Sequence, residues 1–374
     1  MKAITRFTNA IMEKYLPDPY IFVAILTAIV VGLGMIFTDS SFVDMTVYWG
    51  DGFWGILAFT MQMVIVLAAG HVLANSPLFK KVLSGAASKI KTPSMAIIVV
   101  TFVSLVACWI NWGFGLVIGA LFAKEIARQV RKVDYRLLIA SAYSGMVIWH
   151  GGLAGSIPLS IATEGHPFQD VMGVVDTNTT LFSTYNLFIV LVILFTLPFF
   201  NRFLMPKDED VVEIDPSLIK DEEIALPKPE KNFASISERS YIITGIVGLL
   251  GVTYIVYHFA TKGFKLDLNI INTIFVISGI ILHGTPQRFL AAAQQAIKTT
   301  SGIVFQFPFY AGIMGMMTFS GLGAVMSDWF INISNDTTFY LFTFYSAGLV
   351  NFFVPSGGGQ WTVQAPVMLE AATT

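Results

Sequence analysis

The stretch FVPSGGGQW, residues 353–361, breaks an apolar run with a proline and three consecutive glycines. Pro355 has no amide N–H to donate and therefore ends a helix that precedes it. Gly357, Gly358 and Gly359 permit backbone conformations that other residues avoid, and they let another group approach the main chain closely. The stretch predicts a helix that is interrupted inside a hydrophobic segment.

The composition places this interrupted helix in a membrane protein. Of the 374 residues, 55% are hydrophobic and only 12% are charged, whereas a soluble domain carries about 25% charged residues. One bilayer span needs about 20 mostly apolar residues. Runs of this kind cover residues 20–37, 53–74, 181–204 and 241–260. The sequence therefore predicts an all-α polytopic membrane protein, because an apolar helix satisfies its own backbone polar groups in lipid.

A polar segment divides the chain into two hydrophobic parts. Residues 205–240 are rich in Asp, Glu and Lys and contain four prolines. This composition is typical of a mobile, solvated connector. We therefore expect a first membrane repeat at residues 1–204, a polar cytoplasmic linker at 205–240 and a second, incomplete membrane repeat at 241–374.

The two hydrophobic parts are related by a shift of 244 positions. The matching pairs are Gln62 with Gln306, Gly113 with Gly357 and Gly115 with Gly359. Loop charge indicates that the repeats are inverted, because cytoplasmic loops carry the excess of Lys and Arg. Residues 80–91 are basic, whereas the equivalent loop, 324–337, has acidic residues and neither Lys nor Arg. One loop disagrees with this topology, since Lys262 and Lys265 fall on the side that it assigns to the exterior.

The same charge pattern predicts a re-entrant hairpin in each repeat. Residues 124–136 are basic as well, so both ends of the stretch 95–123 face the cytoplasm. That stretch is too short for two crossings at about 1.5 Å rise per residue. We therefore expect a hairpin with its tip at residues 110–115. The repeat predicts a second hairpin at 339–372, which enters from the opposite side and has its tip at 355–360.

The two tips are the predicted binding site. Helices that begin at such breaks direct their N–H groups and positive dipole ends toward the break, where an anion is stabilised. The candidate residues at the tips are Asn111, Trp112, Gly113, Gly115, Ser356, Gly357, Gly358, Gly359, Gln360 and Trp361. The alternative is that the glycines serve close helix packing, as small residues do in membrane proteins.

A third break, WHGGLAGSIP at residues 149–158, contributes His150 and Gly151 to the candidate site. Ionisable residues inside a membrane span are functional candidates, and a histidine changes charge near neutral pH. His150 is thus a candidate carrier of a coupling proton. The alternative is a neutral histidine that hydrogen-bonds a backbone carbonyl.

Several function classes are excluded or disfavoured. The predicted spans contain no Lys or Arg in their cores, which favours a small monocarboxylate over a polyanion as ligand. No Walker A motif, nucleophile–base arrangement or basic nucleic-acid face is found, and Cys108 is the single cysteine. We therefore expect no ATP-driven transport, enzyme activity, metal site, organic cofactor or nucleic-acid partner.

Three motifs carry a resemblance to a known family. They are NFFVPSGGGQW at 351–361, followed by Gln364, Ala365 and Pro366, WINWGFG at 109–115 and HGGL at 150–153. With these motifs the chain resembles the bacterial short-chain fatty acid transporters, the acetoacetate and butyrate permeases. The resemblance implies multi-pass insertion in the bacterial inner membrane and a small carboxylate as substrate. It also implies a fold similar to an ion-transporter superfamily with inverted repeats and paired hairpins.

The leading hypothesis is a secondary transporter, coupled to H⁺ or Na⁺, that binds its substrate between the two tips. A channel-like facilitator for small organic anions is an alternative, as is a transporter of another small carboxylate. An intramembrane enzyme using His150 and a serine finds no support in the spacing. The sequence leaves the oligomeric state open, with a homodimer as one option. Because the chain stops at the counterpart of Val130 and the family continues further, we expect a C-terminally truncated chain.

Overall fold

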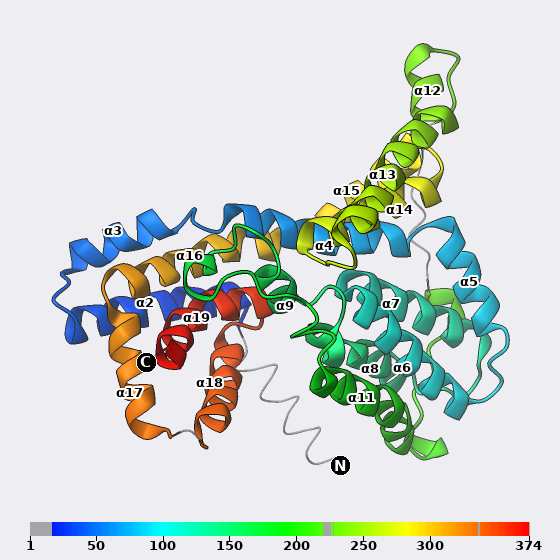
Figure 1. Cartoon of the computed structure of the whole chain (residues 1–374). Helices are drawn as coiled ribbons and strands as arrows, with labels where there is room; N and C mark the ends of the chain where they lie inside the picture. Colours follow the sequence, from blue (N-terminus) through cyan, green and yellow to red (C-terminus); the bar gives the residue numbers. More distant parts are fainter. Residues whose placement is uncertain (1–16, 220–225, 227, 336, 374) are drawn as a thin grey trace. The chain divides into compact units, whose positions relative to one another are not determined.

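The computed structural model describes residues 17–219, 226, 228–335 and 337–373. The structure is 76% helix, and the described residues form no strand (Figure 1). An all-helical fold suits a chain that is mostly apolar, because a helix pairs its backbone N–H and C=O groups within one segment. The predicted fold class, an all-α polytopic membrane protein, is confirmed, whereas the inverted repeats stay a prediction.

Seven helical segments within the described residues are long and apolar enough to cross a membrane. They are α2 (Pro19–Phe37), α4 (Leu57–Ala74), α6 (Pro93–Ile110), the broken segment Tyr135–Ile161, α11 (Thr184–Phe203), α13 (Tyr241–Lys262) and α16 (Ser301–Phe319). The four runs named from the sequence coincide with α2, α4, α11 and α13. The second of them begins later than predicted, at Leu57, because residues 53–56 form a turn.

Two compact units make up the chain: Met1–Thr60, Asp170–Met172 and Gly302–Thr374 in the first, Met61–Gln169 and Gly173–Ser301 in the second. Each predicted repeat thus contributes to both units. A repeat reflects the relation between two parts of a sequence, and a compact unit reflects packing. The predicted boundaries at 204 and 240 therefore stay a prediction.

The first unit contains α2, α3 (Phe42–Gly52), α16, α17 (Leu322–Ile333), α18 (Phe339–Phe353) and α19 (Gly357–Thr373). Helices α3 and α16 approach each other through glycines. A Cβ atom on Gly52 would lie 2.7 Å from the Ala311 carbonyl oxygen and 2.8 Å from the Gly315 Cα. Small residues at such a contact let two backbones come together, which is how membrane helices gain packing energy.

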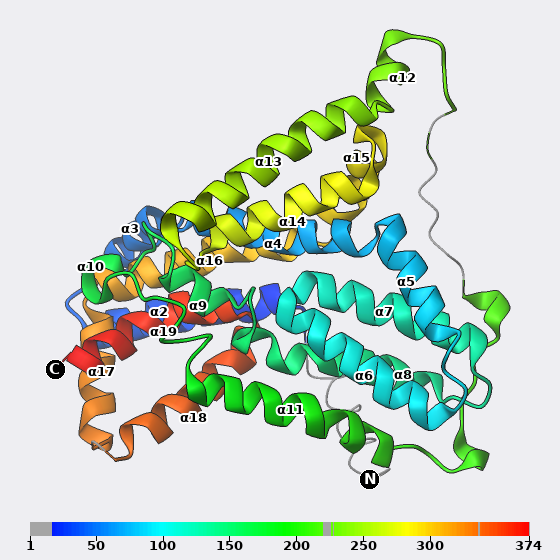
Figure 2. The same ribbon diagram turned by 45° about the vertical axis from the view of Figure 1, so that its right-hand side comes forward.

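The second unit contains most of α4, followed by α5 (Pro77–Ala87), α6, α7 (Trp112–Gln129), α8 (Tyr135–Tyr143), the 3-10 helix η1 (Ser144–Gly151), α9 (Ser156–Ile161) and α11. It continues with α12 (Phe233–Glu238), α13, α14 (Leu268–His283) and α15 (Pro286–Ile297). The four-residue helix α10 (Gln169–Met172) lies at the division between the units. Figure 2 shows α6, α7, α8 and α11 side by side in the second unit.

Both predicted hairpins contain the expected break. Helices α6 and α7 are separated at Asn111, and α18 and α19 at residues 354–356. One detail differs from the expectation, because Gly357, Gly358 and Gly359 begin α19 and do not lie in the break. The helices that follow the breaks have 18 residues in α7 and 17 in α19. Because α6 is itself long enough to span a bilayer, the re-entrant course stays a prediction.

The polar linker differs from the expected mobile, solvated connector. Residues 208–219 contain the short 3-10 helices η2 (Asp208–Asp210) and η3 (Pro216–Leu218). Ile219 is buried, and its carbonyl oxygen accepts a hydrogen bond from the Arg128 guanidinium at 2.9 Å. Composition alone misses this docking, because the contacts join the Glu213 side chain and the Val212 backbone of the linker to residues about 80 positions earlier.

Candidate functional site

Asn111 forms the break between α6 and α7. Its backbone is extended, with φ −159° and ψ 125°, and its N–H donates to the Ala107 carbonyl oxygen at the end of α6. Its side-chain Oδ1 accepts the Phe114 N–H at 2.9 Å and so caps the start of α7. Its Nδ2 donates to the Val66 carbonyl oxygen of α4 at 3.3 Å. One fully buried asparagine therefore ends one helix, begins the next and anchors both to a third.

Glycines let the neighbouring backbones reach this break. A Cβ atom on Gly113 would lie 2.9 Å from the Leu67 Cα, and a Cβ atom on Gly115 would collide with Cys108 on α6. On α4, a Cβ atom on Gly70 would lie 2.5 Å from Asn111 Oδ1. These contacts support the packing alternative for Gly113 and Gly115, while direct binding by either residue stays a prediction.

The third break packs against the first hairpin tip. The Trp109 indole Nε1 donates to the Gly151 carbonyl oxygen at 3.1 Å, and the Leu153 N–H donates to the Trp109 carbonyl oxygen at 2.7 Å. A Cβ atom on Gly152 would collide with the Trp109 carbonyl oxygen. Two motifs that lie some 40 residues apart in the sequence are thus brought together.

An aromatic cluster, Trp112, Trp149 and His150, lies where these motifs meet. The rings of Trp112 and Trp149 are 5.2 Å apart between centroids and nearly perpendicular, at 89°. The rings of Trp149 and His150 are 4.3 Å apart at 81°. The buried Trp112 Nε1–H has no hydrogen-bond partner among the described residues. The buried Trp49 Nε1–H of α3 likewise has no hydrogen-bond partner among the described residues, and a donor of this kind can be bonded by a water molecule or by a ligand.

His150 differs from other histidines of the chain. The rings of His166, His258 and His283 each hydrogen-bond a backbone carbonyl oxygen, at 2.8, 2.9 and 2.9 Å. In the part of the chain that the structure describes, no such bond reaches the ring of His150. The carbonyl-bonded alternative for this residue is therefore not supported, and its ring nitrogens are available to a ligand.

Two asparagines on α11 support the third break, although neither is among the predicted site residues. Asn186 Nδ2 donates to the Gly151 carbonyl oxygen at 3.1 Å and to the Leu181 carbonyl oxygen at 2.7 Å. Asn201 Nδ2 donates to the hydroxyls of Thr101 and Ser144 at 3.1 and 2.9 Å. The signal was present, because an amide inside an apolar run needs a partner in lipid.

The second tip lies in the other compact unit and has polar contacts of its own. The Ser356 hydroxyl accepts the Gly359 N–H at 3.4 Å. Gln360 Nε2 donates to the Ala347 carbonyl oxygen at 2.9 Å and to Gln364 Oε1 at 3.1 Å, and its Oε1 accepts from Asn351 at 2.8 Å. Trp361 follows in the same helix. These bonds join α18 to α19.

Two glycines of this tip face aromatic rings. A Cβ atom on Gly358 would lie 2.6 Å from the Phe59 ring, and one on Gly359 would lie 2.5 Å from the Tyr310 ring. Packing therefore accounts for both residues without a ligand. Because the two tips belong to different units, a joint site between them stays a prediction, as does substrate contact by Ser356, Gly357, Gln360 and Trp361.

Comparison with known proteins identifies the family. The model of the short chain fatty acid transporter family matches residues 1–374. A relative from Escherichia coli K12, provisionally named a short-chain fatty acid transporter, is 45% identical over 372 residues, which are 99% of this chain and 84% of the relative. One from Haemophilus influenzae, with the same provisional name, is 44% identical over 378 residues, 99% of this chain and 85% of the relative. No solved structure matches.

These matches do not confirm the predicted truncation. They agree with the seven candidate spans, which make this a multi-pass membrane protein. By its sequence over its full length, the chain belongs to the short-chain fatty acid transporter family.

Proposed function

We propose that this chain is a secondary active transporter that moves short-chain monocarboxylates, such as butyrate or acetoacetate, across the bacterial inner membrane. The family and the names of the relatives support transport of short-chain fatty acids. A transporter family points away from an enzyme. The observation that carries the proposal is the aromatic cluster at the meeting point of two helix breaks, with its unpaired Trp112 N–H and its available His150 ring.

The cluster has the chemistry that a short fatty acid requires. The Trp112 N–H donates a hydrogen bond to one carboxylate oxygen, and the His150 ring contacts the other. The faces of Trp112 and Trp149 pack against the acyl chain, because an indole combines a large apolar surface with one polar group. A short-chain monocarboxylate needs only these contacts, since it has one negative charge and a small apolar chain.

Coupling to an ion is the second part of the proposal. His150 takes up a proton on one side of the membrane and releases it on the other, because an imidazole changes its charge within the physiological range. A protonated His150 binds a carboxylate more strongly than a neutral one, since the pair is then charge-assisted. Substrate and proton therefore bind together. Sodium is the alternative coupling ion.

Uptake into proteoliposomes tests the proposal. The purified chain is reconstituted, and accumulation of radiolabelled butyrate or acetoacetate is followed with an imposed pH gradient, an imposed sodium gradient or neither. We expect uphill accumulation that needs a gradient and collapses with an ionophore. A channel-like facilitator would equilibrate the substrate without accumulating it. Citrate is the matched control, because its additional charges find no counter-charge at the cluster, and uptake of neither monocarboxylate would overturn the proposal.

A further inference from the structure

The corner between α7 and α8 holds a strained residue. Lys132 has φ 58°, and among the described residues it alone has a positive φ without being glycine. In this region the Cβ atom crowds the backbone, so a glycine would adopt the same conformation more easily. Such strain persists only where surrounding contacts hold it, and it often accompanies function.

The linker supplies those contacts through residues 208–219, which we name the strap. Glu213 Oε2 accepts the Lys132 N–H at 2.9 Å. Two bonds then join Val212 to the start of α8: its N–H donates to Asp134 Oδ2 at 2.9 Å, and its carbonyl oxygen accepts the Tyr135 N–H at 2.9 Å. The strained residue and the two residues at the start of α8 are thus all bonded to consecutive strap residues.

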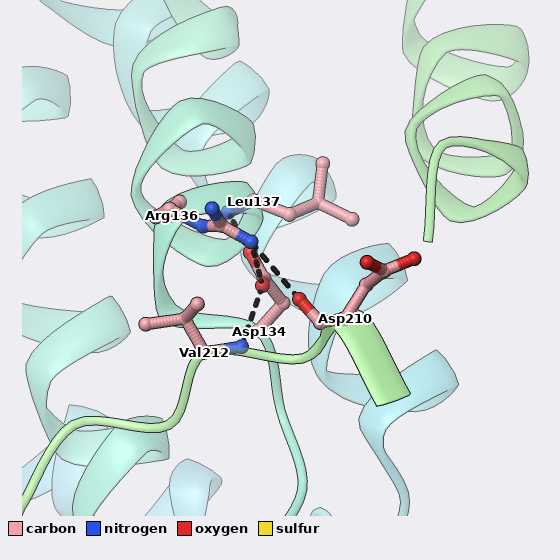
Figure 3. Close-up of polar contacts among 5 residues, drawn as sticks. All are labelled: Asp134, Arg136, Leu137, Asp210 and Val212. Atoms are coloured by element: carbon pink, nitrogen blue, oxygen red, sulfur yellow. Dashed lines mark hydrogen bonds and ion pairs between the residues drawn. The ribbon is translucent and has the colours of Figure 1, made fainter. Parts of the chain in front are cut away.

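Two arginines extend the contact on either side. Arg136 donates to the Asp210 carbonyl oxygen at 3.1 Å and pairs with Asp134 at 3.0 Å (Figure 3). Arg128, near the end of α7, donates to the Ile219 carbonyl oxygen at 2.9 Å. The strap therefore spans the corner and binds the end of one helix and the start of the next.

The helices that meet at this corner carry the aromatic cluster at their other ends. Helix α7 begins at Trp112, and α8 continues into η1, which contains Trp149 and His150. Between the α7–α8 corner and the aromatic cluster, the helices are tightly packed. A Cβ atom on Gly119 would lie 2.8 Å from the Ser104 hydroxyl, and one on Gly145 would collide with the same residue. Closely packed helices move as rigid bodies, because a dense core cannot be deformed gradually.

We propose that the strap is a positioning device, in which Glu213 holds the strained Lys132 corner and thereby sets the relative position of Trp112 and His150. The importance of the strap for substrate binding rests on the proposed function, but its effect on the relative position of Trp112 and His150 does not. The relation between strain and strap follows from the geometry: without the Glu213 carboxylate, Lys132 relaxes toward an ordinary backbone conformation, and the ends of α7 and α8 shift apart.

Hydrogen exchange on the full-length protein in detergent tests this directly. In Glu213→Ala, we expect the amides of residues 109–115 and 148–153 to exchange at least about fivefold faster than in the wild type, a typical minimum for coupling between sites. Lys132→Gly removes the strain, so the double variant Lys132→Gly/Glu213→Ala should return to wild-type exchange in both segments. Glu209→Ala is the matched control, since it removes the same charge from the same strap and should change neither segment.

Any one of three results would overturn the positioning role of the strap. They are unchanged exchange in Glu213→Ala, equal acceleration of exchange in Glu209→Ala, and exchange in Lys132→Gly/Glu213→Ala that stays as fast as in Glu213→Ala. Glu213→Leu is the second variant should Glu213→Ala not fold, because leucine keeps an apolar side chain of similar bulk but has no oxygen to accept the Lys132 N–H, and a complete lack of effect there would count equally against the positioning role. Butyrate uptake by the same variants separates the two proposals. If the wild type transports no butyrate but the variants show the expected exchange pattern, only the proposed function is refuted. If the wild type transports butyrate normally and exchange in Glu213→Ala is unchanged, only the positioning role of the strap is refuted.

Discussion

The indole of Trp112, in the first turn of α7, meets the indole of Trp149 edge to face, with 5.2 Å between the ring centroids. Aromatic pairs of this geometry contribute about 0.5–1.5 kcal/mol beyond their buried area. The pair joins the first hairpin to the third helix break, and the Trp149 ring contacts the His150 ring as well.

Replacing Trp112 by Phe tests the role of the indole N–H. The variant keeps an aromatic ring against Trp149 but removes the donor. We expect the KM for butyrate to rise about tenfold, equivalent to about 1.4 kcal/mol, with a thermal unfolding midpoint close to that of the wild type. Trp54→Phe is the control, because Trp54 is largely exposed and should tolerate the change. An unaltered KM in folded Trp112→Phe protein would exclude the N–H as a substrate donor.

His150→Gln separates a proton carrier from a structural histidine. Glutamine retains hydrogen-bonding groups but does not titrate between pH 5 and 8. We expect proton-driven accumulation to disappear while exchange of labelled for unlabelled butyrate persists, since exchange moves no net proton. His166→Gln gives the comparison, because the His166 ring bonds the Gly173 carbonyl oxygen and its loss should affect both activities through stability. If accumulation in His150→Gln keeps the wild-type pH profile, His150 does not carry the proton.

Gly359→Ala tests the packing interpretation of the second tip. The added Cβ atom would lie 2.5 Å from the Tyr310 ring, and overpacking of this kind destabilises by about 1–3 kcal/mol. We expect a lower thermal unfolding midpoint, partly restored in the double variant Gly359→Ala/Tyr310→Leu. Gly348→Ala is the matched control, because nothing lies within 4 Å of a Cβ atom there. Equal midpoints for both alanine variants would show that Gly359 is not held by packing.

The pH dependence of stability should include a contribution from Asp134. Burial raises the pKa of its carboxyl, but hydrogen bonds from Arg136, Val212 and Leu137 outweigh burial and hold the pKa below its usual value. A carboxyl with a lowered folded-state pKa stabilises the protein above its unfolded pKa of about 3.9. That stability is lost as the pH falls through the folded pKa.

Asp134→Asn measures this contribution. We expect the variant to unfold at a lower temperature than the wild type at pH 7 and the difference to shrink as the pH falls below about 4. Asp208→Asn, at an exposed position of the strap, should have little effect at either pH. A difference between Asp134→Asn and wild type that is constant from pH 7 to pH 3 would contradict the lowered pKa.

Cysteine labelling tests the inverted topology. Ser84 and Asn332 are both exposed in their own units, so a cysteine at either position should be accessible to a reagent. With Cys108 replaced, a membrane-impermeant maleimide should label a cysteine at position 84 only from the cytoplasm and one at position 332 only from outside. Labelling of both positions from the same side would rule out inverted repeats.

Composition and local chemistry determined the membrane class, the main spans and the position of each helix break. Apolar runs of span length leave the backbone no alternative to helix in lipid. Asn111 interrupts a helix by capping the next one, and Pro355 does so because it lacks an N–H. These effects act within a few residues and are therefore readable from the sequence alone.

Only the tertiary structure decided which motifs meet and what the glycines contact. The bond from Trp109 to Gly151 brings the His150 break to the first hairpin, and the bond from Lys132 to Glu213 turns a linker of mobile composition into a docked strap. The sequence left open whether the glycines of the two tips contact a ligand or serve helix packing. In the structure they lie against Leu67, Cys108, Phe59 and Tyr310. Local propensity carries no information on such pairings, because most of them depend on the approach of groups tens to hundreds of residues apart in the chain, and the contact of Gly115 with Cys108 depends on how two helices fold back on each other.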